Sequence, residues 1–320
     1  MVAPVPGLGR LCWLVVVVSV LLLAGCSGTP RTPPPRPANR LARWTAAKAR
    51  WGGRPLLLGH RGGQERGYQN SMAAFGDAIT LGLDYIETDV RHSADGVAVL
   101  QHDPRLPPTC DRYRGHAVRA LTAAELATVR CGGQPIVTLA QLVQRLQQSD
   151  ARRTGLMAEV KDVDPLGVRQ AVAPLGWARV IIESFHWSYL ARIEATDPRV
   201  VTCPLGVSLL TLRRALAVTH DCVGPDEQQA TPVLVAAAHA AGVGVIAWTV
   251  DDPQQAIALA DRQVDGIITD RPRLLASPVR LLRAPPSRAA AGESLRRRCL
   301  RRPAHPLRPT PAAGPARRRG

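Results

Sequence analysis

The chain has 320 residues and a formal net charge of +16, a length that suits one large α/β domain or two smaller ones. The charge is unevenly placed. Residues 55–275 hold 21 basic and 24 acidic residues, whereas 27–54 hold seven basic and no acidic residues, and 280–320 hold 12 arginines against one glutamate. Basic, low-complexity flanks around a near-neutral body are typical of tails, so the composition argues against a nucleic-acid-binding protein.

The N-terminal segment 1–25 is predicted to be a signal peptide. Arg10 precedes an apolar stretch, Leu11–Leu23, that is shorter than the roughly 20 apolar residues needed to span a bilayer. The stretch closes on LAGC at Leu23–Cys26, which resembles a bacterial lipobox, where cleavage leaves a lipidated cysteine. The alternative is a signal peptide that happens to contain a cysteine. We expect an exported protein that Cys26 anchors to the outer face of the bacterial cell membrane, with 26–54 as a Pro/Arg-rich tether.

Residues 55–276 alternate apolar runs with helix-like stretches. The expected helices 71–82, 138–148 and 231–242 each open on a serine or threonine that suits an N-cap. Eight runs are typical of strands, namely 56–59, 85–90, 155–160, 179–185, 199–205, 220–224, 244–250 and 265–270. Eight apolar strands joined by helices predict an α/β fold of one domain, a closed (β/α)8 TIM-type barrel.

The run 97–102 does not fit this count. Only six residues separate Val90 from Val97, and they include Asp95-Gly96, so the connection is too short for a parallel crossover. It is predicted to be a β-hairpin that returns His102 towards the end of the barrel. Residues 103–137 then form a small irregular insertion after the second barrel strand. Residues 277–320, rich in Arg, Pro and Ala, lack apolar periodicity and are predicted to be a disordered tail.

Four cysteines of the body are interpreted as structural. Export permits disulfides, and Cys110/Cys131 and Cys203/Cys222 are each close enough in sequence to pair. Four cysteines allow three connectivities, so the sequence leaves the pairing open. No CxxC motif or Cys/His cluster in the sequence indicates a zinc site.

The carboxyl ends of the expected strands, where active sites of this fold are built, carry acidic residues. Glu87 and Asp89 share one face of the second strand, and Glu159 ends the third. Buried carboxylates are costly unless they bind a metal or form ion pairs, so we expect these three to hold a divalent cation, Ca²⁺ or Mg²⁺. A lone Glu-x-Asp is more often an ion pair at a surface, and the expectation depends on the recurrence of such residues at successive strand ends.

Basic residues and histidines accompany these carboxylates. Arg61 and Lys161 beside a cation suggest an anionic, phosphate-bearing substrate. His60 and His102 are two groups that can exchange a proton near neutral pH. Trp248, at the end of the seventh strand, is a candidate wall of the substrate pocket, although an aromatic residue there is about as often core packing.

Several motifs together resemble the glycerophosphodiester phosphodiesterase family. They are HRG (60–62), ETDV (87–90), LQHD (100–103), EVK (159–161), ESF (183–185), AWTV (247–250) and DGIITDRP (265–272). The resemblance implies a TIM-type barrel that splits a glycerophosphodiester into sn-glycerol 3-phosphate and an alcohol. The roles that it implies are cation binding for Glu87, Asp89 and Glu159, general acid/base catalysis for His60 and His102, and phosphate binding for Arg61 and Lys161.

The chain departs from the family pattern near the first motif. The family usually shows Pro-Glu-Asn-Thr where this chain has Tyr68-Gln69-Asn70-Ser71, so Gln69 replaces a carboxylate at the mouth of the site. Two alternatives stay open: a related phosphodiesterase that acts on lysophospholipids, or a non-catalytic surface lipoprotein that binds glycerophosphodiesters. We expect a small-molecule substrate, no nucleic-acid partner and a monomer.

Overall fold

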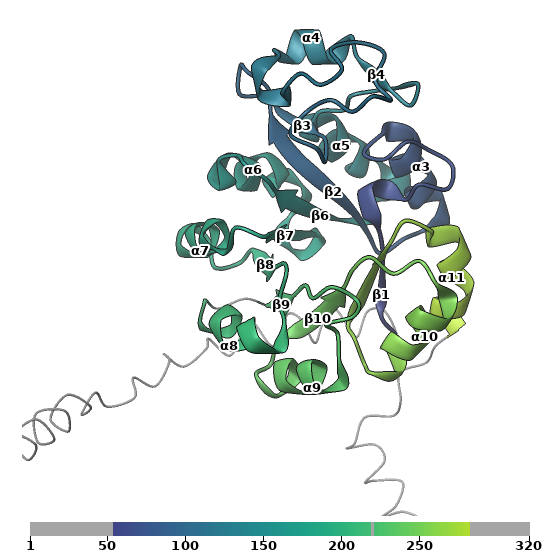
Figure 1. Cartoon of the computed structure of the whole chain (residues 1–320), viewed down its shortest axis with the longest axis vertical. Helices are drawn as coiled ribbons and strands as arrows, with labels where there is room; N and C mark the ends of the chain where they lie inside the picture. The colour runs from purple at the N-terminus through teal and green to yellow at the C-terminus, as the bar shows by residue number, and fades with distance from the viewer. Residues whose placement is uncertain (1–53, 219–220, 282–320) are drawn as a thin grey trace, which may run out of the picture. The chain divides into compact units, whose positions relative to one another are not determined.

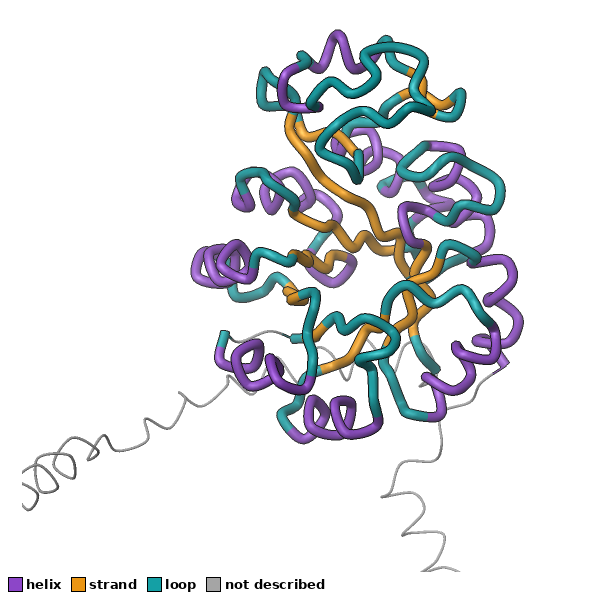
Figure 2. The backbone as a smooth tube through the Cα atoms, viewed as in Figure 1, coloured by secondary structure: helices purple, strands orange, loops and turns teal. Residues whose placement is uncertain are grey.

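Eight parallel strands alternate with helices over residues 54–218 and 221–281, the part of the chain that the structure, a computed structural model, describes. Figures 1 and 2 show the strands as a ring with the helices standing around it. The strands are β1 (Leu56–Gly59), β2 (Tyr85–His92), β6 (Gly155–Val160), β7 (Val180–Ser184), β8 (Val201–Pro204), β9 (Cys222–Val223), β10 (Gly244–Ala247) and β11 (Gly266–Thr269). The predicted (β/α)8 barrel is confirmed.

Each strand of this ring is followed by a helix, which returns the chain to the start of the next strand. The surrounding helices are α3 (Met72–Leu81), α5 (Leu139–Leu146), α6 (Pro165–Val172), α7 (Trp187–Thr196), α8 (Leu209–Ala217), α9 (Pro232–Ala240), α10 (Pro253–Asp261) and α11 (Pro272–Leu281). The three helices predicted from sequence begin where expected, because the side chains of Ser71, Thr138 and Thr231 each accept a hydrogen bond from a backbone N–H of the first turn.

Parallel pairing runs around the ring in the order β8-β7-β6-β2-β1-β11-β10-β9. The last gap, between β8 and β9, has a single isolated bridge between Leu205 and Gly224 in place of a full ladder. A disulfide joins Cys203 of β8 to Cys222 of β9 across the same gap. The barrel is therefore nearly closed by hydrogen bonds, and a covalent bond crosses the seam where they are fewest.

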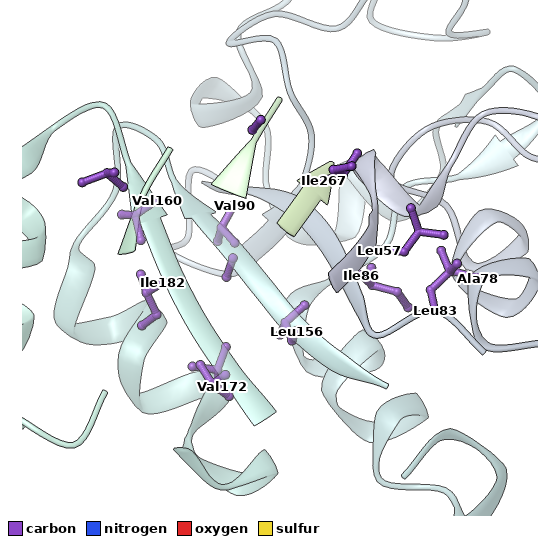
Figure 3. Close-up of a cluster of buried hydrophobic side chains, with 14 of the residues drawn as sticks. Leu57, Ala78, Leu83, Ile86, Val90, Leu156, Val160, Val172, Ile182 and Ile267 are labelled. Atoms are coloured by element: carbon purple, nitrogen blue, oxygen red, sulfur yellow. The ribbon is translucent and has the colours of Figure 1, made fainter. Parts of the chain in front are cut away.

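Two apolar layers hold the ring together. The larger lies between the strands and the surrounding helices, and Figure 3 shows side chains of Leu57, Ile86, Leu156, Ile182 and Ile267 within it. The smaller fills the inside of the barrel below the strand ends. Its members are Leu56, Leu58, Tyr85, Met157, Ile181, Cys203, Cys222, Ile246 and Ile268. Because this inner layer plugs the barrel, a ligand has access only at the mouth above it.

The predicted hairpin forms at the end of β2, which extends past the ring in Figure 1. Strand β3 (Ala98–Leu100) pairs antiparallel with β2 through Val90↔Leu100 and His92↔Ala98. Gly96 takes a φ of +81° in the connecting turn, a conformation that glycine adopts without strain. The hairpin brings His102 to the end of the barrel where the parallel strands have their carboxyl ends.

The insertion after β3 has a small core of its own. It contains the helix α4 (Ala123–Ala127) and a two-stranded sheet of β4 (Arg130–Cys131) and β5 (Gln134–Pro135). A disulfide joins Cys110 to Cys131 and lies among buried apolar side chains such as Leu106 and Leu126. Both cysteine pairs that are close in sequence are therefore bonded, which settles the connectivity that the sequence left open.

The expected domain boundaries shift by a few residues. Helix α11 continues to Leu281, five residues past the expected boundary at Ala276, because Leu275 and Val279 give it a buried i, i+4 face. Arg54, expected in the tether, donates hydrogen bonds of 2.7 and 2.9 Å to the buried carboxylate of Asp84. The body therefore includes both Arg54 and Leu281.

Several expectations fall outside the described residues. These are the signal peptide, the lipidation site Cys26, the tether up to residue 53 and the tail from residue 282. Among the helices of 54–218 and 221–281, none combines the length and the apolar character that crossing a bilayer requires.

Candidate active site

A cavity of about 160 Å³ opens at the carboxyl ends of the barrel strands. It lies where the fold places active sites, above the apolar plug of the barrel. Its lining comes from both the hairpin and the barrel strands, and consists of His60, Arg61, Glu87, His102, Glu159, Lys161, Glu183, Phe185, Leu205, Trp248, Thr249 and Ile268. Of the site residues predicted within the described chain, all but Asp89 line this cavity, and Asp89 contacts two that do.

Glu87, Asp89 and Glu159 form a buried cluster, with carboxylate oxygens that lie within 4.8 Å of one another. Two of them come from β2 and the third from β6, and the register of these strands places Asp89 beside Glu159. All three side chains are nearly inaccessible, at 2, 1 and 7% exposure. The strand alternation that predicted a shared face for Glu87 and Asp89 is thus realised inside the barrel.

The electrostatics of this cluster are unequal. Burial raises the pKa of Glu87 and of Glu159 to about 7, and the charge of Asp89 adds to both shifts. Burial acts in the same direction on Asp89, but Lys161 and Arg61 outweigh it and lower the pKa of that carboxyl to about 2. The raised pKa values mean that Glu87 and Glu159 do not ionise readily without a cation. Together the three buried carboxylates form an oxygen donor set that fits a hard divalent cation.

Arg61 is tied to both acids of β2. Its backbone N–H donates to Glu87 Oε2 at 2.8 Å, and its Nε lies 3.3 Å from Asp89 Oδ2. Its Nη1 donates to Gln69 Oε1 at 2.5 Å, so the residue that departs from the family pattern still anchors this arginine. Gly62 has a φ of +90°, and a Cβ there would lie 2.9 Å from that of Ala74, so the HRG motif needs its glycine.

Lys161 neutralises the other side of the cluster. Its ammonium lies 2.5 Å from Glu159 Oε2 and 3.1 Å from Asp89 Oδ1. These carboxylates raise its pKa although burial opposes the shift. Lys161 therefore carries its charge at neutral pH, within reach of the cavity that it lines.

His60 is held between two carboxylates. Its Nδ1 lies 2.7 Å from Asp270 Oδ1, and its Nε2 lies 3.9 Å from Glu87 Oε2. Burial disfavours the imidazolium, but the hydrogen bond to Asp270 and the charge of Glu87 prevail and raise the pKa of His60. A carboxylate can only accept a hydrogen bond, so Nδ1 carries a hydrogen and Nε2 is the nitrogen directed to the cavity.

His102 has a similar but weaker set of contacts. Its Nδ1 lies 2.8 Å from Asp103 Oδ1, and its backbone carbonyl accepts hydrogen bonds of 2.9 and 2.6 Å from Arg91. Burial, assisted by the positive charge of Arg61, lowers the pKa of His102 despite the opposing effect of Asp89. The hairpin thus brings a second imidazole to the cavity that His60 lines, with its pKa shifted the other way.

Aromatic residues wall the side of the cavity away from the Glu87, Asp89 and Glu159 cluster. The rings of Phe185 and Trp248 meet edge to face, with centroids 5.5 Å apart and planes at 87°. Trp248 Nε1 donates to the Gly224 carbonyl at 3.0 Å, which fixes the indole with its ring along the cavity. The sequence left open whether Trp248 was a pocket wall or core packing, and in the structure it lines the pocket.

Three residues of the site were missed from sequence. Asn70 donates to Asp89 Oδ2 at 2.8 Å and so orients that carboxylate, while its own amide oxygen accepts from Thr88. Asp270 holds His60, and Glu183 lines the cavity from β7. The motifs of the last two were recognised, but no role was assigned to either residue. Ser184, which follows Glu183 on β7, donates to the Val160 carbonyl.

Known proteins share this fold and sequence pattern. A family model described as the glycerophosphoryl diester phosphodiesterase family matches residues 60–274. The chain is 36% identical over 247 residues to probable glycerophosphodiester phosphodiesterase 2 of Mycobacterium tuberculosis, covering 71% of this chain and 90% of that protein. It is 28% identical over 245 residues to a glycerophosphodiester phosphodiesterase of Caldanaerobacter subterraneus, covering 70% and 98%.

Solved structures agree with this relationship. The crystal structure of a glycerophosphodiester phosphodiesterase from Agrobacterium tumefaciens superposes with a TM-score of 0.62 at 26% identity, over 70% of this chain and 99% of that one. Both the family model and the superposition span the barrel that carries the cavity. The chain therefore belongs to the glycerophosphoryl diester phosphodiesterase family and is a phosphoric diester hydrolase.

Proposed function

We propose that this protein hydrolyses glycerophosphodiesters to sn-glycerol 3-phosphate and an alcohol, with a divalent cation and two histidines. The observation that carries the proposal is the convergence of a buried three-carboxylate cluster, two cationic side chains and two carboxylate-bound imidazoles on one cavity. The names of its relatives agree with this substrate class.

Glu87, Asp89 and Glu159 are the residues that would hold the cation, either Ca²⁺ or Mg²⁺. Their donor atoms are oxygens only, which hard cations prefer. When bound, the cation neutralises charge on the oxygens of the phosphodiester. Asn70 supports this role, because its hydrogen bond fixes the orientation of the Asp89 carboxylate.

Arg61 and Lys161 would bind the phosphodiester. Arg61 is fixed by its backbone bond to Glu87 and by Gln69, so its guanidinium is oriented before substrate arrives. Lys161, the residue after β6, contacts the other oxygen of Asp89. These two positively charged side chains, on either side of one carboxylate, offset the repulsion between the acidic cluster and an anionic substrate.

His60 and His102 would transfer the protons. Their Nδ1 atoms are occupied by Asp270 and Asp103, which leaves Nε2 of each ring for exchange. One Nε2 removes a proton from the nucleophile, which is the substrate's own 2-hydroxyl or a water. The other donates a proton to the departing alcohol. Attack by the 2-hydroxyl gives a cyclic phosphate, which the second step opens with water.

The same proposal places the protein outside the cytoplasm, as a monomer anchored by lipid at Cys26. The support is the LAGC sequence after an apolar stretch, together with two disulfides in the barrel and its insertion. Metabolic labelling with a fatty-acid analogue tests the anchor. Wild-type protein should take up the label, and the variant Cys26→Ala should not.

The test of the activity uses purified protein that has been stripped of metal with a chelator. Glycerophosphocholine, glycerophosphoethanolamine and glycerophosphoglycerol are supplied with Ca²⁺, Mg²⁺ or neither, and release of glycerol 3-phosphate is measured. Release should require a cation and should be lost in His60→Ala and Glu87→Gln. His116→Ala, which alters an exposed histidine of the insertion, is the matched control. Cation-independent release, or full activity of His60→Ala, would contradict the proposal.

A further inference from the structure

The cavity has a charged side and an apolar side. Residues from β1, β2 and β6 and their ends make the charged side, where the acidic cluster, Arg61 and Lys161 lie. The apolar side comes from the ends of β7, β8, β10 and β11 and consists of Phe185, Leu205, Trp248 and Ile268. Glu183 of β7 is a carboxyl on this apolar side, next to the boundary between the two.

Glu183 is level with the acids of the cluster but does not belong to it. The strand register aligns Asp89 with Glu159, Glu159 with Glu183, and Glu183 with Cys203. Among residues 54–218 and 221–281, the carboxylates close enough together to share a cation are Glu87, Asp89 and Glu159, without Glu183. Glu183 therefore stands outside the set that would hold the cation, one strand further on.

The carboxyl of Glu183 also lacks what a buried polar group requires. The side chain is 2% exposed, and its Oε2 has no hydrogen-bond partner within the described chain. His60 and Arg61, which also line the cavity, have hydrogen-bond partners in Asp270 and Gln69. A buried oxygen without a partner is costly, and a ligand hydroxyl in the cavity would supply the missing hydrogen bond.

We propose that Glu183 binds the terminal hydroxyl of the substrate's glycerol group and so selects phosphodiesters that carry it. This inference rests on the proposed function, which places the phosphodiester at Arg61 and Lys161. The secondary hydroxyl of glycerol is on the carbon next to the phosphate-bearing one, so it stays near the histidines. The terminal hydroxyl is one carbon further away and reaches the side of the cavity where Glu183 lies.

The shape and polarity of this side suit a glycerol chain. Its carbons would lie against Phe185 and Trp248, the edge-to-face pair, which offers apolar surface without hydrogen-bonding groups towards the cavity. Glu183 then supplies the polar contact. Glu183 lines the cavity, and no hydrogen bond within the described chain reaches either of its oxygens, so the oxygen that faces the cavity can accept one from the ligand.

The test compares two substrates that differ by one hydroxyl. The first is the p-nitrophenyl ester of glycerol 3-phosphate, and the second is the corresponding ester of propane-1,2-diol phosphate, which keeps the secondary hydroxyl and lacks the terminal one. The full-length protein is assayed with saturating cation, beside Glu183→Gln, Glu183→Met and the control His116→Ala. Glutamine keeps a hydrogen-bonding group, whereas methionine has nearly the same length and lacks one.

Wild-type protein should favour the glycerol ester by at least about tenfold in kcat/KM, because a site built to bind a hydroxyl rejects the analogue without it. Glu183→Met should lower kcat/KM for the glycerol ester by about 10- to 100-fold and leave the propanediol ester nearly unchanged, so that the preference disappears. Glu183→Gln should keep most of the preference. Equal losses on both esters in Glu183→Met would overturn the assignment.

Two further outcomes separate this inference from the proposed function. Wild-type protein that cleaves both esters equally well overturns the role of Glu183 and leaves the hydrolase proposal standing, and this comparison needs no variant to fold. Wild-type protein that cleaves neither ester, nor any glycerophosphodiester, overturns the proposed function and with it the role of Glu183.

Discussion

His60 follows the first strand of the barrel and Asp270 follows the last, and the two side chains meet at 2.7 Å. Strands β1 and β11 pair in parallel, and this pairing brings the two residues together although 210 positions separate them. Two hydrogen bonds orient Asp270: its backbone N–H donates to Asp251 Oδ1, and its Oδ1 accepts from Gln64. The imidazole is therefore positioned by the closure of the fold.

Replacing Asp270 by asparagine tests this relationship. The amide cannot hold Nδ1–H as a carboxylate does, so Asp270→Asn should lower kcat, by at most the roughly 10²–10⁴-fold that general acid/base catalysis contributes. Asp270 raises the pKa of His60, so its loss should move the His60 limb of the pH–rate profile to lower pH. The measurement is kcat/KM as a function of pH. Gln64→Ala, which removes only a neighbouring hydrogen bond, should leave the profile in place.

Protons and cations should compete for the acidic cluster. Glu87 and Glu159, with pKa values near 7, take up protons as the pH falls through that value, whereas Asp89, at about 2, stays ionised. Affinity for Mg²⁺ or Ca²⁺ should therefore fall by about 10- to 100-fold between about pH 8 and about pH 6. Titration calorimetry in two buffers of different ionisation enthalpy would show proton release on binding. An affinity that does not change with pH would contradict this competition.

The departure at Gln69 should affect activity little. Its amide oxygen already accepts a hydrogen bond from Arg61 Nη1. The variant Gln69→Glu therefore adds a negative charge but no new contact to Arg61. We expect kcat/KM for glycerophosphocholine to change by less than about tenfold, whereas Gln69→Ala, which releases the guanidinium, should lower it by about tenfold or more. A large gain in Gln69→Glu would mean that the absent carboxylate limits the rate of this protein.

The sequence predicted those parts of the site that depend on local pattern. Alternation along β2 was sufficient to place Glu87 and Asp89 on one face, and the short Asp95-Gly96 connection was sufficient to predict the hairpin that returns His102. Asp270 could not be assigned in this way, because its contact depends on which strand closes the ring against β1.

Glu183 was missed for a related reason. It precedes the last residue of its strand, and only the register of β7 against β6 shows that it lies level with Glu159 inside the barrel. The end of the body was placed at residue 276, before the end of α11, because the proline- and arginine-rich composition that follows concealed the buried face of Leu275 and Val279. Local composition thus indicated the elements, and three-dimensional register decided which side chains meet.

The two disulfides provide a matched test of how position matters. Cys110–Cys131 and Cys203–Cys222 span 21 and 19 residues, so loop-closure entropy predicts nearly the same stabilisation of about 3 kcal/mol for each. We expect Cys110→Ala/Cys131→Ala to lower the free energy of unfolding by about this amount and to keep activity. Cys203→Ala/Cys222→Ala should lose more activity, because Leu205, close to this bond, lines the cavity. Urea denaturation and kcat/KM measure both, and equal effects would contradict the distinction.

The seam between β8 and β9 has a consequence for the protein's behaviour in solution. Strands at the rim of an open sheet present unpaired N–H and C=O groups, which invite strands from other molecules. In this barrel the edges of β8 and β9 face each other, and the disulfide between Cys203 and Cys222 keeps these two strands together. A chain that folds in a reducing compartment would lack this disulfide. Backbone hydrogen bonds such as that from the Gly224 N–H to the Pro204 carbonyl would then hold the seam alone, and we expect such a chain to open there more readily and to associate edge to edge with other copies.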